Sequence, residues 1–139
     1  MNIKVITLDK IRDKFAKEAT AEYTKRLSKY CKLSYKECKS CTQVLKELDD
    51  KSFVVHISTQ GNLISSEELA KKISDLALAG KSDISFLISQ EELNERIQEK
   101  INIALAVSKM DIDFSVLIVI LHEQIYRAYR INSNEPYHK

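Results

Sequence analysis

FVVHISTQGNLISSEELAKKISDLALAGKSDISFLI, residues 53–88, carries the clearest structural pattern in the chain. Residues 53–58 form an apolar run around a single histidine, the pattern of parallel strands that are covered on both faces. Ser65 and Glu68 then form a capping box at the start of a helix, and Gly80 is placed to end it. A second apolar run follows at residues 84–88. The order of strand, helix and strand predicts a parallel β–α–β unit.

The alternation of strands and helices continues on both sides of this unit. Further strands are expected at residues 2–8, 33–38 and 104–107, and further helices at residues 10–30, 42–50 and 89–101. The helix at residues 10–30 has a basic outer side, and its inner face is expected to contain Ile11, Phe15, Ala19, Tyr23 and Leu27. We therefore expect an α/β fold, with a mostly parallel sheet flanked by helices, in one domain over residues 1–139.

A last helix is expected from about Asp113 to Ile131. Its first half, Val116–Leu121, is apolar on every side. A helix of this kind needs cover on every side, which a small domain obtains most easily from a second subunit. The pattern therefore predicts a homodimer.

The composition is that of an ordinary globular protein, with 44% hydrophobic and 30% charged residues. The net charge of +2 is too small to indicate a polyanionic partner by itself. The chain has no run of about 18 uncharged apolar residues, so we expect no contact with membranes. Residues 1–5 alternate like a strand and differ from a signal peptide, which favours a cytoplasmic location.

The cysteines and histidines offer a competing hypothesis. Cys38 and Cys41 form a CxxC pair, which together with Cys31 is compatible with a small metal or thiol protein. No second CxxC or nearby histidine completes a zinc set, so we predict no metal site. His56 and His122 lie inside a predicted strand and helix, where structural histidines are more common than ligands.

Ligands of parallel sheets usually bind in loops beyond the carboxyl ends of the strands. Here these loops are residues 58–62, 89–92 and 108–111, and none contains a glycine-rich phosphate-binding motif. Glu91 and Glu92 are interpreted as partners of a helix dipole rather than an acid–base pair. The tail, residues 126–130 and 134–139, mixes arginines with tyrosines, as RNA-binding surfaces do.

Several segments together resemble one known family. They are Ala21-Glu22-Tyr23-Thr24-Lys25-Arg26-Leu27, Gln60-Gly61, Ser65-Ser66-Glu67, Ala104-Leu105-Ala106-Val107-Ser108-Lys109-Met110, Glu123-Gln124-Ile125-Tyr126-Arg127-Ala128 and Tyr137-His138-Lys139. With these segments the chain resembles, over nearly its whole length, the bacterial ribosomal RNA large subunit methyltransferase H family.

The resemblance implies a SPOUT-class fold with a C-terminal trefoil knot, a homodimer, and S-adenosylmethionine as methyl donor. It further implies N3-methylation of a pseudouridine in large-subunit (23S) ribosomal RNA, with the RNA or the ribosome as partner. The implied cofactor-binding residues are Ile57, Ser89, Val107, Ser108, Lys109, Met110, Asp111 and Ile112. The implied RNA-binding residues are Arg127, Arg130, Tyr137, His138 and Lys139. It identifies no catalytic base.

The chain departs from this family at the cofactor loop. Relatives carry glycines where this chain has Ser89, Gln90 and Leu93. They also carry Pro-His and an arginine where it has residues 113–114 and Ile118. Glycine lets a ligand lie against the main chain, so we expect the side chains here to crowd the cofactor. A second hypothesis is therefore a knotted dimer that binds RNA or the ribosome without methyl transfer.

Overall fold

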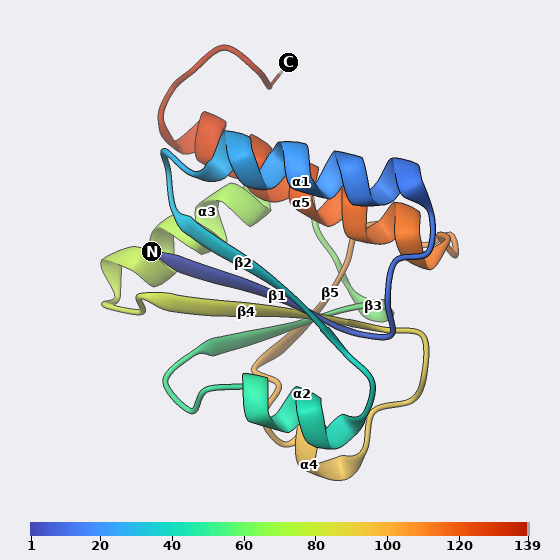
Figure 1. The fold of residues 1–139 in the computed structure, drawn as a ribbon. Helices are drawn as coiled ribbons and strands as arrows, with labels where there is room; N and C mark the ends of the chain where they lie inside the picture. Colours follow the sequence, from blue (N-terminus) through green and yellow to red (C-terminus); the bar gives the residue numbers. More distant parts are fainter. Residues whose placement is uncertain (139) are drawn as a thin grey trace.

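A computed structural model describes residues 1–138 and contains one sheet of five strands (Figure 1). The strands are β1 (Asn2–Leu8), β2 (Lys32–Cys38), β3 (Phe53–Leu63), β4 (Asp83–Ser89) and β5 (Ile103–Ala106). Their order is β2-β1-β4-β3-β5, and every neighbouring pair is parallel. The predicted α/β fold with a parallel sheet is confirmed. The trefoil knot stays a prediction.

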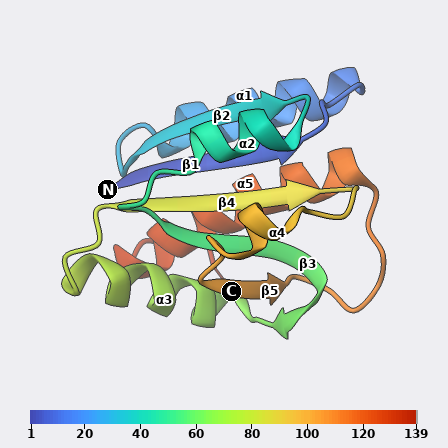
Figure 2. The same cartoon turned by 90° about the horizontal axis from the view of Figure 1, so that it is seen from below.

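Helices cover both faces of the sheet. They are α1 (Lys14–Leu27), α2 (Cys41–Glu47), α3 (Ser66–Leu78), α4 (Glu95–Gln98) and α5 (Phe114–Asn132). Figures 1 and 2 show α1, α3 and α5 on one face and α2 and α4 on the other. Each face has its own apolar cluster, and the one beneath α1, α3 and α5 is the larger. No helix within residues 1–138 is both long enough and apolar enough to cross a membrane.

The start of α3 agrees with the sequence pattern. The Ser65 hydroxyl accepts a hydrogen bond from the Glu68 N–H at 3.1 Å, and the Glu68 carboxylate accepts one from the Ser65 N–H at 3.0 Å. After the helix, Gly80 has a φ of 84°, which glycine adopts without strain. The capping box and the terminating glycine are thus confirmed.

The predicted inner face of α1 is partly wrong. Phe15 is 56% exposed, whereas Ala16, Thr20 and Leu27 are buried. An α-helix has 3.6 residues per turn, so each step of four residues rotates the position slightly around the helix axis. After several such steps the residues no longer lie on one face. The helix also begins at Lys14 rather than at residue 10.

The helix predicted for residues 89–101 is reduced to α4. Ser89 does not cap it, because its hydroxyl accepts from the Glu91 N–H at 3.0 Å and donates to the Glu91 carbonyl oxygen at 2.6 Å. Such local side-chain bonds offer the backbone an alternative to a helix. Asn94 caps the short helix instead, accepting from the Ile97 N–H at 3.0 Å.

Gly61 lets β3 pass closely over β5. The pairing of these strands is interrupted between Ile57 and Asn62 and then resumes. A Cβ atom on Gly61 would lie 2.6 Å from the carbonyl carbon of Ala104 and from the backbone nitrogen of Leu105. Only a residue without a side chain fits this crossing.

His122 lies on the buried face of α5 and packs edge-on against Tyr35, with ring centroids 5.6 Å apart. Its Nδ1 atom lies 2.8 Å from the carbonyl oxygen of Ile118, and its Nε2 atom has no partner within residues 1–138. Burial lowers the pKa of this imidazole. The folded protein therefore holds His122 neutral.

This burial predicts an acid-sensitive fold. The unfolded chain binds a proton at His122 near pH 6.5, whereas the folded chain does so only at lower pH, so stability is lost as the pH falls below 6.5. His122 is expected to contribute up to about 1.4 kcal/mol of this loss per pH unit. Urea unfolding of the wild type and His122→Gln between pH 7.5 and pH 5 measures it. The two curves should diverge below pH 6.5, and parallel curves would contradict the assignment.

Candidate functional site

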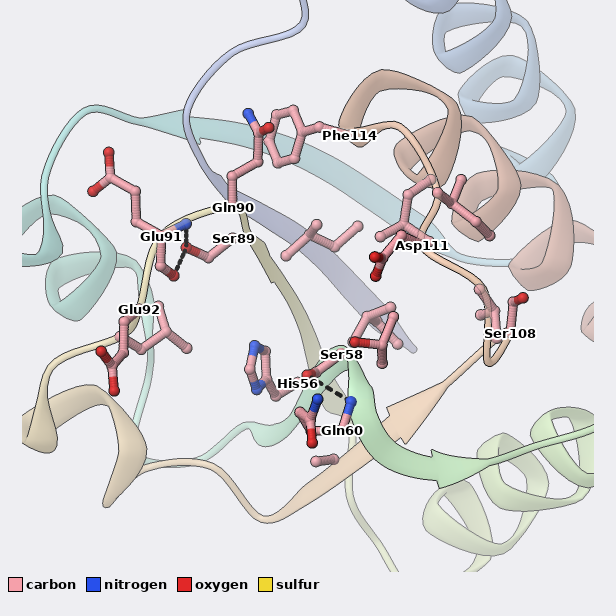
Figure 3. A pocket seen from close by; sticks show the side chains of 18 of the residues that line it. His56, Ser58, Gln60, Ser89, Gln90, Glu91, Glu92, Ser108, Asp111 and Phe114 are labelled. Atoms are coloured by element: carbon pink, nitrogen blue, oxygen red, sulfur yellow. Dashed lines mark hydrogen bonds between the residues drawn. The ribbon is translucent and has the colours of Figure 1, made fainter.

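A cavity of about 690 Å³ lies at the carboxyl ends of β3, β4 and β5, beside the start of α5. This volume is in the range of small-molecule sites. It is also where ligands bind in open parallel sheets. Figure 3 shows His56, Ser58 and Gln60 from β3, with Ser89–Glu92 on one side and Asp111 on the other. The cavity is therefore built from loops that are far apart in the sequence.

The cavity wall combines apolar and polar side chains. The apolar residues are Ile57, Ile88, Leu93, Ile101, Ala104, Val107, Met110, Ile112, Phe114 and Leu117. The polar and charged ones are His56, Ser58, Thr59, Gln60, Ser89, Gln90, Glu91, Glu92, Gln98, Ser108 and Asp111. An apolar wall with a few polar groups suits an organic ligand that has both kinds of surface.

Seven of the eight residues predicted to bind a cofactor line this cavity. They are Ile57, Ser89, Val107, Ser108, Met110, Asp111 and Ile112. Lys109, the eighth, is not among the lining residues. The Ser108 hydroxyl accepts the Met110 N–H at 2.9 Å, which shapes the turn around Lys109.

The loop after β4 leaves the cavity open despite its side chains. The Ser89 hydroxyl is held by the backbone of Glu91, and the Gln90 amide donates to the Asp9 carboxylate at 3.2 Å. Both polar ends are thus engaged by the protein itself. The expected crowding does not close the cavity.

Asp9 anchors this arrangement from the end of β1. Its φ of 123° is unusual for a residue with a side chain. The Thr7 hydroxyl donates to its carbonyl oxygen at 2.8 Å, and its carboxylate accepts from the Lys10 N–H at 2.7 Å. The hydrogen bond from Arg12 is the main cause of the lowered pKa of Asp9. Its charged carboxylate is therefore available to hold Gln90.

His56, which the sequence pattern predicts to be structural, lines the cavity. It follows the apolar residues of β3, is half-buried, and burial lowers the pKa of its imidazole. Its side chain therefore reaches the cavity as a neutral group. The histidine inside an apolar run was the only sequence signal for it. Gln98 and Ile101 gave none, because their approach depends on how α4 packs.

The predicted RNA-binding residues cluster at the far end of α5. Arg127 donates to Glu123 at 2.9 Å and lies 4.8 Å above the ring of Tyr137. Arg130 donates to the Tyr126 hydroxyl at 3.0 Å.

His138 closes this cluster. It contacts Arg127 and pairs with the carboxylate of Glu67. Lys139 lies outside the described residues. The cavity touches the start of α5, and the 19 residues of this helix span about 28 Å. The tail of a chain thus lies at the opposite end of α5 from that chain's own cavity.

The cysteines form no metal centre. Cys31 and Cys38 are buried, Cys41 is half-buried, and all three are free thiols. Among residues 1–138, no group of three or more His, Cys, Asp or Glu side chains is arranged to hold a metal ion. The structure thus offers the metal hypothesis no support within this range.

A family described as "Predicted SPOUT methyltransferase" matches residues 1–138. The chain belongs to the SPOUT methyltransferase family. One curated relative, 40% identical, is the putative ribosomal RNA large subunit methyltransferase H of Methanococcus maripaludis. Another, 38% identical, is the ribosomal RNA large subunit methyltransferase H of Clostridium novyi. Each comparison covers 100% of both chains.

Solved structures support the SPOUT fold at low sequence identity. A probable methylase family protein from Haemophilus influenzae has a TM-score of 0.60 at 13% identity, covering 99% of this chain and 70% of that one. A TrmH/SpoU tRNA modifying enzyme from A. aeolicus has a TM-score of 0.54 at 11% identity, covering 96% and 77%. At these identities the likeness concerns the fold alone.

Proposed function

We propose that this chain is an S-adenosylmethionine-dependent methyltransferase that modifies N3 of a pseudouridine in large-subunit ribosomal RNA. The observation that carries the proposal is the cavity beyond β3, β4 and β5, whose wall contains seven of the eight expected cofactor residues. Full-length similarity to proteins named ribosomal RNA large subunit methyltransferase H supports the choice of substrate.

The residues present fit this donor in size and chemistry. The cavity has room for a nucleoside with an amino-acid arm, since sites for such ligands measure about 300–1,000 Å³. Ile57, Val107 and Ile112 offer apolar surface for a purine, while Ser58 and Ser108 offer hydroxyls for polar groups. When bound, S-adenosylmethionine supplies a methyl group activated by a sulfonium. Ser89 and Gln90 do not obstruct it, because both are held by the protein.

The protein's task in this reaction is mainly to position the reacting groups. Holding two reactants in line contributes several kcal/mol to catalysis without acid or base groups. The apolar wall made by Phe114 and Leu117 at the start of α5 excludes water from that side of the cavity. The N3 proton must also leave, and we assign no residue to accept it.

We further propose that the enzyme acts as a homodimer through α5. Val116 and Ile120 lie four residues apart on one side of this helix, are only half-buried, and belong to neither apolar core cluster. Because a chain's own tail is at the other end of α5, two copies with antiparallel α5 helices bring each tail toward the partner's cavity. Arg127 and Tyr137 would then meet the RNA there.

Transfer of a labelled methyl group to large ribosomal subunits that lack the modification tests the proposed function. Mass spectrometry of the digested RNA should find one N3-methylpseudouridine per subunit. Ser108→Trp, which fills the cavity, should abolish the product while the circular dichroism spectrum is unchanged. Subunit binding without any methylated product would contradict the proposal and support the non-catalytic alternative.

A further inference from the structure

We infer that the cavity selects its donor by positive charge, so that it holds S-adenosylmethionine more tightly than the neutral product S-adenosylhomocysteine. The inference rests on the proposed function and concerns acidic residues in two loops at the cavity. One loop follows β4 and replaces the glycine-containing loop expected from relatives, and the other follows β5. Glu91, Glu92 and Asp111 are the residues that carry it.

The charges that line the cavity have one sign. Three acidic residues, Glu91, Glu92 and Asp111, are among the residues that line it, and within residues 1–138 no lysine or arginine is. The chain as a whole has 22 basic and 20 acidic residues, so this separation is a local feature. Figure 3 shows Asp111 across the cavity from the loop with Glu91 and Glu92.

No ion pair within residues 1–138 neutralises these carboxylates, although Glu91 also faces a second hollow that Lys10, Arg12 and Lys39 line. None of the three side chains forms an ion pair or a hydrogen bond with another side chain among residues 1–138. His56, the titratable residue of β3 that lines the cavity, is kept neutral by burial. The cavity therefore presents uncompensated negative charge to a ligand.

This charge distinguishes the two forms of the cofactor. S-adenosylmethionine carries one positive charge more than S-adenosylhomocysteine, which lacks the sulfonium. Because the carboxylates are exposed, water and salt screen their attraction, and we expect a preference of about tenfold. The same charge repels anions, so RNA phosphates are expected to bind outside the cavity.

Calorimetric titration of the wild type with three compounds tests the inference. The compounds are S-adenosylmethionine, S-adenosylhomocysteine and sinefungin, an analogue that carries an ammonium group in place of the methylated sulfonium. The two cationic compounds should bind about tenfold more tightly than the neutral one, and the ratio should shrink as salt rises from 50 mM to about 500 mM. The salt series needs no variant.

Variants locate the effect. Glu91→Gln, Glu92→Gln and Asp111→Asn combined should bring the ratio of the two affinities to about one, mainly by weakening the cationic compounds. Glu99 is an exposed carboxylate beside α4 that does not line the cavity. Glu99→Gln should therefore leave the ratio of the two affinities unchanged. Wild-type protein that binds S-adenosylhomocysteine equally well or better would overturn the inference and leave the proposed function standing. Failure of all three compounds to bind would overturn both.

Discussion

Gly61→Ala is expected to lower the free energy of unfolding by about 3 kcal/mol. The added methyl would lie 2.6 Å from two backbone atoms of β5 and 2.7 Å from the Ala104 carbonyl oxygen. These are backbone atoms of a strand paired to β3, so they cannot turn aside as a flexible side chain would. Separating the two strands would also move Ile57, one wall of the cavity. Donor affinity should therefore fall together with stability.

Gly80→Ala is the matched control. Gly80 also has a special conformation, with a φ of 84°, but no atom lies within 4 Å of its added Cβ. Its replacement should cost only about 1 kcal/mol, from backbone strain. Urea unfolding measures both variants. If both variants lose the same free energy of unfolding, the close packing of β3 on β5 is not the reason for the glycine at position 61.

Ile120→Glu is expected to turn the proposed dimer into a monomer and to reduce methyl transfer at least 100-fold. Burying an unpaired carboxylate in a subunit interface costs several kcal/mol, which is enough to weaken the association of the subunits about 100-fold. On the proposed arrangement, activity should fall as well, since each cavity would lose the tail of the other copy. Sedimentation velocity at micromolar concentration and the ribosomal methylation assay measure the two effects.

Leu78→Glu serves as the control for this variant. Leu78 is the last residue of α3 and is 84% exposed, so a charge there is tolerated without a change of assembly. Thermal unfolding confirms that both variants fold. If the Ile120 variant remains dimeric, α5 is not the interface. If it is a fully active monomer, the tail does not act across subunits.

Local signals predicted part of the fold well. α3 was predicted with both ends, because Ser65, Glu68 and Gly80 act within a few residues of one another. The helix at residues 89–101 was mostly wrong, because the hydroxyl of Ser89 bonds within its own turn. A serine stands three residues before a glutamate both at Ser65 and at Ser89. Only the surrounding packing decides whether that serine caps a helix.

The candidate site was predicted less directly. Its loops were expected from the carboxyl ends of parallel strands. The family resemblance implied eight cofactor residues, of which all but Lys109 line the cavity. His56 and Gln98 were missed, since their place in the wall depends on how distant elements pack. The contact between Gln90 and Asp9, which holds the side-chain amide of Gln90, joins positions 81 residues apart. No local pattern contains such a contact.

A crystal structure of the protein with millimolar S-adenosylmethionine tests whether the cavity holds the methyl donor. The donor should lie within the cavity, between Ile57, Ser89 and Val107, with Gln90 still bonded to Asp9. A cavity filled by the side chains of Gln90 and Glu92, with no donor present at that concentration, would contradict it.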